Sequence, residues 1–362
     1  MLYRAVAGKS PLEVCIQLSD IFEDTNVYVV HDEVVSFIFD QKVVAGVSGS
    51  RYHYDYLVLA LGSESAYFGI PGLEEHAFQL KELDDSERIR VHTERMFAIA
   101  ASETNRNKRR EYLRFVIGGG GLTGVELATE MAERFDSLSE QYHIDPSEPE
   151  MMLVELSSSI LPSLDGKQVA RSIEALQAMG IQILTNTRVT GMREHDGRLE
   201  MLRIPGDAIP TRTMIWTGGI RISDLIRRSG AETGPQGRVI VNEFLQVRHY
   251  PEVFAIGDNA LAINPQSGKA VPTAAQFALQ QGYITADNLE RIMNGRALKI
   301  YRPRVLGEVV SLGRHLAIGW AVLPIGTKIR FVGFVGSLIK RAISERHLFL
   351  LWKERQNWTG HW

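Results

Sequence analysis

Short apolar runs alternate with longer helical repeats along this chain, and that pattern predicts an α/β protein. In the first hundred residues, β-branched or aromatic runs predict strands at 27–30, 34–39, 43–47 and 54–61. The run from Asp84 to Ala101 then has helical spacing. Beyond it the two patterns continue to alternate. The expected strands are 112–117, 152–154, 181–184, 213–216 and 253–256, and the expected helices are 125–132, 168–179 and 272–288.

Two polar segments interrupt the pattern. The charged cluster Asn105 to Arg110 is typical of a solvated loop, and we expect a domain boundary there. The connection from Gln141 to Glu150 contains two prolines and predicts an exposed insertion. At 362 residues, the chain exceeds what one hydrophobic core usually organises, so we expect two domains and a smaller appendage.

The amino-acid composition excludes several kinds of partner, cofactor and metal site. A formal net charge of −3 gives no electrostatic reason to expect nucleic acid as a partner. The single cysteine, Cys15, excludes an internal disulfide, a CxxC pair and a multi-thiolate metal site, and its apolar neighbours predict a buried thiol. The ten histidines show no metal-ligand spacing. We therefore expect an organic cofactor and no metal. The N-terminus lacks a secretory signal and no apolar run could span a bilayer, so we expect the cytoplasmic side.

The sharpest local motif is the glycine loop Gly119 to Gly124, which fits G-x-G-x-x-G between a predicted strand and a predicted helix. Gly119 permits a tight turn, Gly121 admits a pyrophosphate, and Gly124 brings the helix against the strand. Glu155 ends the next predicted strand, where it can accept hydrogen bonds from ribose hydroxyls. No arginine follows it at 156–158, which favours NADH over NADPH. The alternative is a glycine-rich turn that binds nothing.

A second motif is the apolar strand 253–256, which delivers Gly257 and Asp258 at its carboxyl end, where ligands of open α/β sheets bind. On spacing alone, an Asp that caps a helix fits as well as one that binds a ligand.

Several segments together resemble the flavoprotein reductases with two dinucleotide-binding domains, and within them the type II, non-proton-pumping NADH:quinone oxidoreductases. The sharpest of these segments is 272–282, whose Ala-Gln-Phe-Ala-Leu-Gln-Gln-Gly run matches the A-Q-x-A-x-Q-Q-G pattern that lines the quinone site in that family. The others are 54–63, 68–72, 116–127, 216–219 and 255–258.

The resemblance implies FAD and NADH as cofactors and a membrane quinone as the acceptor. It implies that Asp258 holds the flavin ribityl chain and that Ala275 covers the isoalloxazine. Gln276 and Gln280 would face the quinone head group, and Glu126 would lie near the nicotinamide and the flavin. Gly257 and Gly218 complete the expected cofactor-binding residues. From the residues alone, 272–288 is also an ordinary amphipathic helix, and Glu126 a helix-surface acid in a first turn.

The resemblance also sets the expected architecture: two Rossmann-like dinucleotide-binding domains and a C-terminal amphipathic tail. We expect a discontinuous FAD domain at 1–105 and 237–300, an NADH domain at 106–236 and a membrane-associating region at 301–362. Relatives begin with a second glycine loop that cradles the FAD pyrophosphate. No second G-x-G-x-x-G occurs here, so we expect the FAD domain to be truncated by a first βαβ half.

The tail carries an apolar stripe at helical spacing with basic residues beside it, which suits a helix that lies on a membrane. The same stripe suits docking on the protein's own core or in a homodimer. Its apolar members are Phe331, Phe334, Val335, Leu338, Ile339, Ala342 and Ile343, its basic members are Lys328, Arg330, Lys340 and Arg341, and Trp352, Trp358 and Trp362 follow.

The leading hypothesis is therefore an enzyme at the cytoplasmic face of a membrane, peripherally bound, that transfers hydride from NADH to FAD and two electrons to a quinone. A soluble NADH-dependent reductase of a small redox protein is the second hypothesis. A truncated nucleotide-binding protein without flavin or catalysis is the third.

Overall fold

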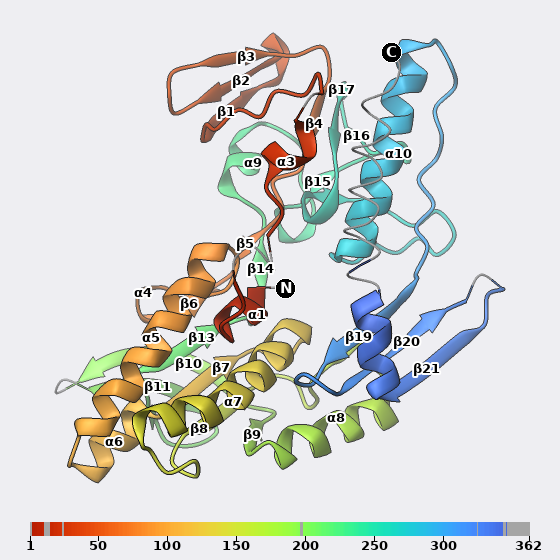
Figure 1. The fold of residues 1–362 in the computed structure, drawn as a ribbon. Helices are drawn as coiled ribbons and strands as arrows, with labels where there is room; N and C mark the ends of the chain where they lie inside the picture. The colour runs from red at the N-terminus through yellow and green to blue at the C-terminus, as the bar shows by residue number, and fades with distance from the viewer. Residues whose placement is uncertain are drawn as a thin grey trace. The chain divides into compact units, whose positions relative to one another are not determined.

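The protein folds into two compact units, shown in a computed structural model that describes residues 2–10, 15–23, 25–195, 198–323, 325–342 and 345. Unit 1 contains the chain up to Val29, Ser65–Gly219 and the part from Gly307 onward, and unit 2 contains Val30–Glu64 and Ile220–Leu306 (Figure 1). The expected domains are grouped differently here, because residues 65–105 belong with the glycine loop in unit 1. Which cofactor each domain binds stays a prediction.

Unit 1 is built on a parallel sheet of five strands in the order β6-β13-β7-β8-β9. Their bounds are β6 (Phe78–Gln79), β13 (Thr213–Trp216), β7 (Arg114–Gly118), β8 (Glu150–Val154) and β9 (Ile181–Leu184). This order places the carboxyl ends of β13, β7 and β8 side by side. It is the edge where nucleotides bind in open α/β sheets.

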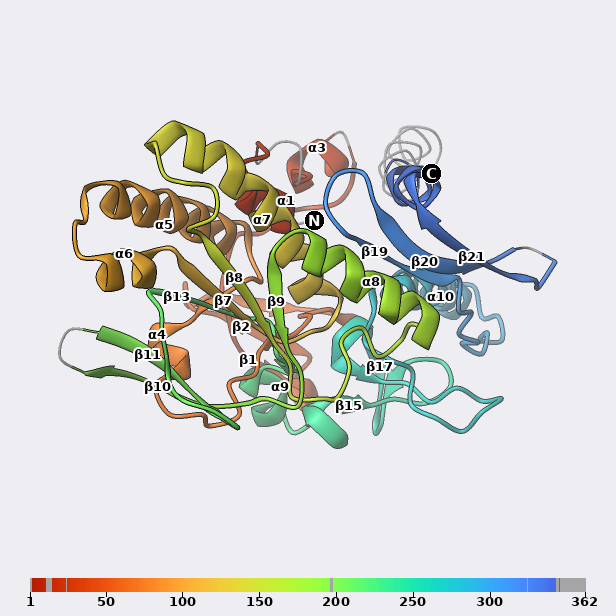
Figure 2. The ribbon, with the colours of Figure 1, turned by 90° about the horizontal axis from the view of Figure 1, so that it is seen from below.

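Alternate residues of these strands enter two different cores, as strand geometry requires. Phe115 and Ile117 pack with helices α5 (Leu83–Ser102), α7 (Leu122–Tyr142) and α8 (Gly166–Ala178). Val116 between them packs on the other face, with an antiparallel sheet of three strands (Figure 2). That sheet comprises β10 (Arg188–His195), β11 (Arg198–Ile204) and β12 (Ile209–Pro210). The parallel sheet is therefore covered on both faces, and the middle residues of β7, β8 and β13 are apolar and buried.

A second antiparallel sheet in unit 1 lies near α7 and α8. It contains β19 (Gly307–Ser311), β20 (Ala317–Val322) and β21 (Lys328–Gly333), in that order, with β19 against α7 and β20 against α8. The other elements of unit 1 are short helices: α1 (Leu2–Val6), α3 (Leu18–Phe22), α4 (Leu73–His76) and α6 (Arg106–Tyr112).

Unit 2 combines small sheets around the core that contains Leu59, Phe254 and Phe277. Strand β17 (Tyr250–Ala255) lies between β16 (Gln246–Val247) and β4 (Leu57–Leu59), antiparallel to the first and parallel to the second. The other strands are β1 (Val34–Ile38), β2 (Val43–Gly46), β3 (Arg51–His53), β15 (Val239–Ile240) and β18 (Ala260–Leu261). The helices are α9 (Asp224–Arg228) and α10 (Ala275–Met293), with 3-10 turns η1 (Phe39–Gln41), η2 (Pro235–Gly237) and η3 (Gly257–Asn259). The chain crosses between the units at β5 (Glu64–Ser65) and β14 (Ile220–Arg221).

Two local predictions were wrong. Residues 27–30 form no strand; Tyr28 is 90% exposed, and β-branched composition only favours a strand where a neighbouring surface covers it. The polar cluster from Asn105 is a helix rather than a loop, because the Asn105 side chain accepts hydrogen bonds from the N–H groups of Asn107 and Lys108 and caps α6.

The thiol of Cys15 is exposed rather than buried. It lies in irregular backbone just before α3. In the tail, the helix comprises 334–342, whereas Phe331 lies in β21 and is buried. Pairing with β20 explains the difference, because Phe331 is the one residue of this strand that is buried, and its neighbours on either side are not. Ile343 and the three tryptophans lie outside the described residues.

Candidate functional site

The glycine loop of unit 1 follows β7 directly and opens α7, as the motif predicts. Gly119 has a φ of 110°, which favours glycine, and a Cβ there would lie 2.8 Å from the backbone of Thr217 and Gly218. A Cβ on Gly124 would lie 1.9 Å from the Gly119 carbonyl oxygen. A Cβ on Gly121 would meet no protein atom within 4 Å. The loop is therefore closely packed on its inner side and open at Gly121.

Glu155 lies beside this loop at the end of β8. One carboxylate oxygen accepts a hydrogen bond from the Gly120 N–H at 2.7 Å, and the other accepts one from the Ser157 N–H at 2.7 Å. These bonds fix the carboxylate where the glycine loop and the end of β8 meet. The structure thus brings Glu155 and Gly218, which are distant in the sequence, to the loop that contains Gly119, Gly121 and Gly124.

Thr217 is a part of this edge that the sequence argument missed. Its hydroxyl donates to the carbonyl oxygens of Gly118 at 3.0 Å and Gly119 at 3.2 Å, and its backbone N–H donates to Gly118 at 2.7 Å. The end of β13 therefore holds the start of the glycine loop. The sequence does not indicate this contact, because Thr217 reaches the glycine loop only through the pairing of β13 with β7.

Glu126, in the first turns of α7, is buried with 8% of its surface exposed. Its carboxylate accepts a hydrogen bond from the Ser311 N–H at 3.0 Å and forms an ion pair with Lys340. The alternative of a helix-surface acid was therefore wrong, because the β19 backbone and the C-terminal helix cover this residue. The position expected near nicotinamide and flavin stays a prediction.

Lys340 was expected among the basic residues of a helix that lies on a membrane, and the structure instead points its amine at Glu126. Burial, and then the charge of Arg4, lower the pKa of Lys340 to about 7. The pair is thus a carboxylate and an amine in direct contact at a largely buried position. No spacing in the sequence indicates the pair, since the two residues are 214 positions apart.

In unit 2, the turn η3 presents Asp258 at the carboxyl end of β17. The Ser63 hydroxyl, just after β4, donates to the Asp258 carboxylate at 2.8 Å. Gly257 has a φ of 68°, and its N–H donates to the side-chain oxygen of Gln281 at 2.6 Å. The ends of two adjacent parallel strands and α10 therefore meet at this acid.

Arg238 is a second residue that sequence reasoning missed. It is buried, and its guanidinium donates to the carbonyl oxygens of Ala260 and, at 3.0 Å, Val271. Burial lowers the pKa of Arg238, and the charge of Asp258 opposes the shift. Arg238 thus ties the segment that follows Asp258 to the segment that precedes α10. A lone arginine before a short strand gives no signal of this role in the sequence.

Helix α10 begins at Ala275, which is exposed. The side-chain oxygen of Gln276 accepts a hydrogen bond from the Leu306 N–H at 2.8 Å. The amide of Gln280 accepts from the Arg304 N–H and donates to the Arg304 carbonyl oxygen, both at 2.8 Å. Both glutamines therefore fix the extended backbone at 304–306 beside the helix. Their contact with a quinone stays a prediction.

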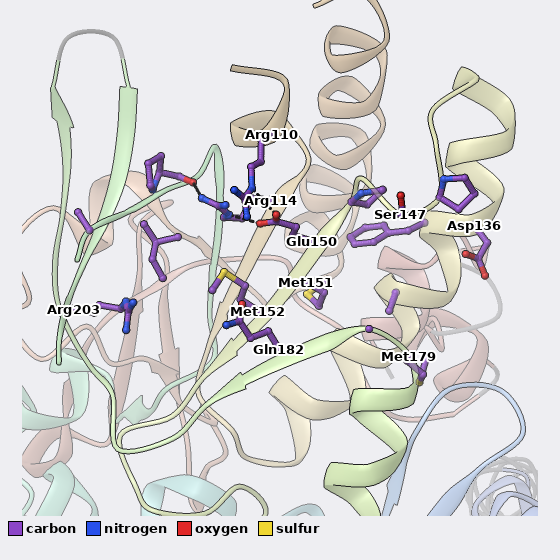
Figure 3. A pocket seen from close by; sticks show the side chains of 18 residues that line it. Arg110, Arg114, Asp136, Ser147, Glu150, Met151, Met152, Met179, Gln182 and Arg203 are labelled. Carbon is purple, nitrogen blue, oxygen red and sulfur yellow. Dashed lines mark hydrogen bonds and ion pairs between the residues drawn. The ribbon is translucent and has the colours of Figure 1, made fainter. Parts of the chain in front are cut away.

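A separate cavity of about 530 Å³ lies in unit 1 at the opposite edge of the parallel sheet, where β7 and β8 begin (Figure 3). Arg110 and Arg114 both pair there with Glu150, each at 2.6 Å. The residues predicted for the cofactors do not line it. It is therefore distinct from the nucleotide edge.

Comparisons with known proteins bear on both units. The sequence profile of the family described as pyridine nucleotide-disulphide oxidoreductase matches residues 7–282. A type II NADH:quinone oxidoreductase of Staphylococcus aureus (strain NCTC 8325 / PS 47) is 30% identical over 355 residues, which cover 96% of this chain and 84% of that relative. The protein of the same name from Staphylococcus epidermidis is 31% identical over 300 residues, which cover 83% and 72%. The chain therefore belongs to the pyridine nucleotide-disulphide oxidoreductase family.

Solved structures agree on the fold of these oxidoreductases. NDH2 from Plasmodium falciparum in complex with NADH has a TM-score of 0.83 at 18% identity, and the match covers 99% of this chain and 88% of that one. The sulfide:quinone oxidoreductase of Aquifex aeolicus has a TM-score of 0.75 at 17% identity, with 97% and 81% covered. The expected pair of dinucleotide-binding domains in an α/β fold is confirmed.

Proposed function

We propose that this protein is an NADH dehydrogenase of the type II class, which uses FAD and reduces a quinone at a membrane surface. The observation that carries the proposal is the edge of unit 1 where an open glycine loop and Glu155 meet, in a chain of this family. Relatives named type II NADH:quinone oxidoreductase support the acceptor.

The nucleotide edge fits NADH. Gly121 leaves room for a pyrophosphate at the first N–H groups of α7, which attract negative charge. Glu155 is held by two backbone N–H groups, and its carboxylate keeps further lone pairs that can accept hydrogen bonds from ribose hydroxyls. A 2′-phosphate beside this carboxylate would be repelled. The geometry therefore supports NADH over NADPH.

The turn at Asp258 fits FAD. Carboxylates at the ends of parallel strands accept hydrogen bonds from ligand hydroxyls, and Ser63 and Gln281 fix this turn on both sides. When bound, FAD accepts hydride from NADH and releases electrons to an acceptor. In this proposal Asp258 holds the ribityl hydroxyls, while Ala275, small and exposed, leaves space at the start of α10.

The Glu126–Lys340 pair supports a role in proton transfer to the quinone. NADH supplies one hydride, so the reduction of a quinone to a quinol needs one further proton from solution. A buried pair whose amine has a pKa of about 7 gains and loses a proton in the physiological range. Gln276 and Gln280 would border the quinone, with the segment 304–306 that they fix.

Membrane contact is proposed for the C-terminal helix at 334–342. Phe334, Val335 and Leu338 are 63%, 59% and 48% exposed, which is unusual for large apolar side chains that lie close together. Lys328 and Arg341 add positive charge, and among the described residues no helix is long and apolar enough to cross a bilayer. These features support a peripheral anchor, which the proposal places on the cytoplasmic face.

The experiment follows NADH oxidation by the purified full-length chain with a short-chain quinone, alongside flotation on anionic vesicles. We expect flavin-dependent quinone reduction and flotation with the vesicles. A double variant, Phe334→Glu with Leu338→Glu, should stay with the unbound fraction, while Val91→Glu, an exposed position on α5, should float. Reduction of small redox proteins without quinone reduction would contradict the proposal.

A further inference from the structure

The cavity in unit 1 where β7 and β8 begin lies apart from the nucleotide edge. Its volume of about 530 Å³ falls within the range of about 300–1,000 Å³ that is usual for small-molecule sites. Its walls come from α6, α7, β8, β9, β11 and the segment that leads into β12 (Figure 3). Segments that are distant in the sequence therefore build a hollow that the proposed function leaves unused.

Three arginines line the cavity, and two acids oppose their charge. Arg110 and Arg114 share the single carboxylate of Glu150. Arg203 is the third arginine, and Asp136, exposed on α7, is the second acid. Three positive and two negative side chains leave one positive charge in excess. This balance suits a ligand with one negative charge, whereas a phosphate or a nucleotide carries more negative charge than the lining can offset.

Arg203, on β11, has hydrogen-bond donors that the protein does not use. Its Nη1 donates to the Pro205 carbonyl oxygen at 2.8 Å, whereas its Nε is buried and has no partner among the described residues. A Cβ on Gly206 would lie 2.5 Å from the same Nη1, so the turn at 205–206 packs against the guanidinium and fixes it. Figure 3 shows Arg203 apart from the arginines that pair with Glu150. Its charge is therefore available to an anionic acceptor, which forms strong hydrogen bonds with a guanidinium.

The uncharged part of the lining is mostly apolar and flexible. Met151, Met152 and Met179 all line the cavity, and methionine side chains adapt to the shape of an apolar ligand. Among the described residues of the lining, Phe135 is the one aromatic residue, and it is 6% exposed. Little aromatic surface is thus available to stack on a nucleobase or another flat ring. The lining therefore favours an alkyl chain over a planar ligand.

We propose that this cavity binds a monocarboxylic acid with an alkyl chain of medium length. The carboxylate accepts hydrogen bonds from Arg203, and the chain lies against Met151, Met152 and Met179. A volume of about 530 Å³ holds roughly 17 groups of the size of water, which is enough for a carboxylate and a chain of about ten carbons. The proposal is independent of the proposed function, because no residue predicted to bind NADH, FAD or quinone lines the cavity.

Calorimetric titration of the purified full-length chain with decanoate, below the concentration at which decanoate forms micelles, tests the proposal. We expect saturable binding at one site per chain. Butyrate should bind more weakly because its chain is too short to cover the methionines, and decylammonium should bind more weakly because arginine repels its charge.

Arg203→Met removes the charge and keeps an unbranched side chain. It should weaken decanoate binding at least about tenfold, which is the loss of one hydrogen bond to a charged group. Arg193→Met is the matched control, because Arg193 lies on the neighbouring strand β10 and outside the cavity, with its side chain 55% exposed. This control should bind decanoate like the wild type.

Two further variants distinguish the cavity from other apolar surfaces. Ala208→Trp narrows the cavity without removing a charge, so it should also weaken decanoate binding. The double variant Phe334→Glu with Leu338→Glu removes exposed apolar side chains from the C-terminal helix and should bind decanoate like the wild type. The Tm of each variant without decanoate shows that a loss of binding occurs in a folded protein.

Three results would overturn the proposal. The first is a folded wild type that does not bind decanoate or binds decylammonium equally well. The second is decanoate binding that Arg203→Met and Ala208→Trp both leave unchanged. The third is binding that is lost in the double variant, which would place decanoate on the C-terminal helix.

Discussion

Two glycines of the same loop should respond oppositely to one added methyl group. In Gly124→Ala, the new Cβ would lie 1.9 Å from the Gly119 carbonyl oxygen and 2.8 Å from the Thr217 hydroxyl. Carbon–oxygen contacts are normally about 3.3 Å or longer. The start of α7 must therefore move away from the loop by roughly 1.4 Å, the difference between these two distances. Overpacking of this kind costs about 1–3 kcal/mol.

Calorimetry and NADH titration measure the two consequences. For a protein of this size, 1–3 kcal/mol corresponds to a Tm lower by about 1–4 °C. The displaced N–H groups should weaken NADH binding at least about tenfold, or 1.4 kcal/mol. Gly121→Ala is the matched control: its Cβ meets no protein atom within 4 Å, so Tm should change little while NADH affinity falls, because the ligand fills that space.

The reasoning would be refuted by a Gly124→Ala protein with the wild-type Tm and the wild-type NADH affinity. A Gly121→Ala protein that binds NADH as tightly as wild type would show that no pyrophosphate lies against that glycine.

Three other predictions concern single residues. Glu155→Arg should raise the KM for NADH and shift preference towards NADPH, because a cation replaces the carboxylate at the ribose. Unchanged steady-state kinetics with both coenzymes would mean that Glu155 does not contact the ribose. Asp258→Ala should lower the ratio of flavin to protein absorbance after gel filtration about tenfold, while Asp224→Ala, a surface acid of the same unit, should keep it. The pKa of Lys340 is about 7 in the folded chain and about 10.4 when unfolded. Between these two values the unfolded chain binds more protons than the folded chain. The free energy of unfolding should therefore rise with pH across that window, by up to about 1.4 kcal/mol per pH unit. Urea unfolding of wild type and Lys340→Met at pH 7 to 10 measures this, and equal slopes would contradict the burial of Lys340.

Much of the fold could be predicted because local patterns determine it. The bounds of β9 and β13 match the predicted strands, and α5 differs from its prediction by one residue at each end. The antiparallel strands β10 and β11 were missed, because their half-buried faces interrupt the apolar alternation. Exposure of 27–30 and capping by Asn105 depend on neighbours that composition does not specify.

The site was predictable to the extent that it is contiguous in sequence. The glycine loop and the strand-end acid Asp258 are read from local order, and Glu155 from its place after the next strand. The contacts of Lys340, Arg238 and Thr217 were missed because each is made with a distant segment. The C-terminal helix is an example of what the sequence pattern cannot predict. Its apolar stripe was recognised from Phe334 onward. The inward direction of the Lys340 side chain depends on where α7 and α1 place Glu126 and Tyr3.

The central claim is that this chain carries electrons from NADH through FAD to a quinone. Anaerobic stopped-flow absorbance of the purified protein tests it most directly. NADH should bleach the flavin bands within the turnover time, and a subsequent pulse of quinone should restore them with one quinol formed per flavin. Absence of flavin bands, or bands that NADH bleaches but quinone does not restore, would contradict the account.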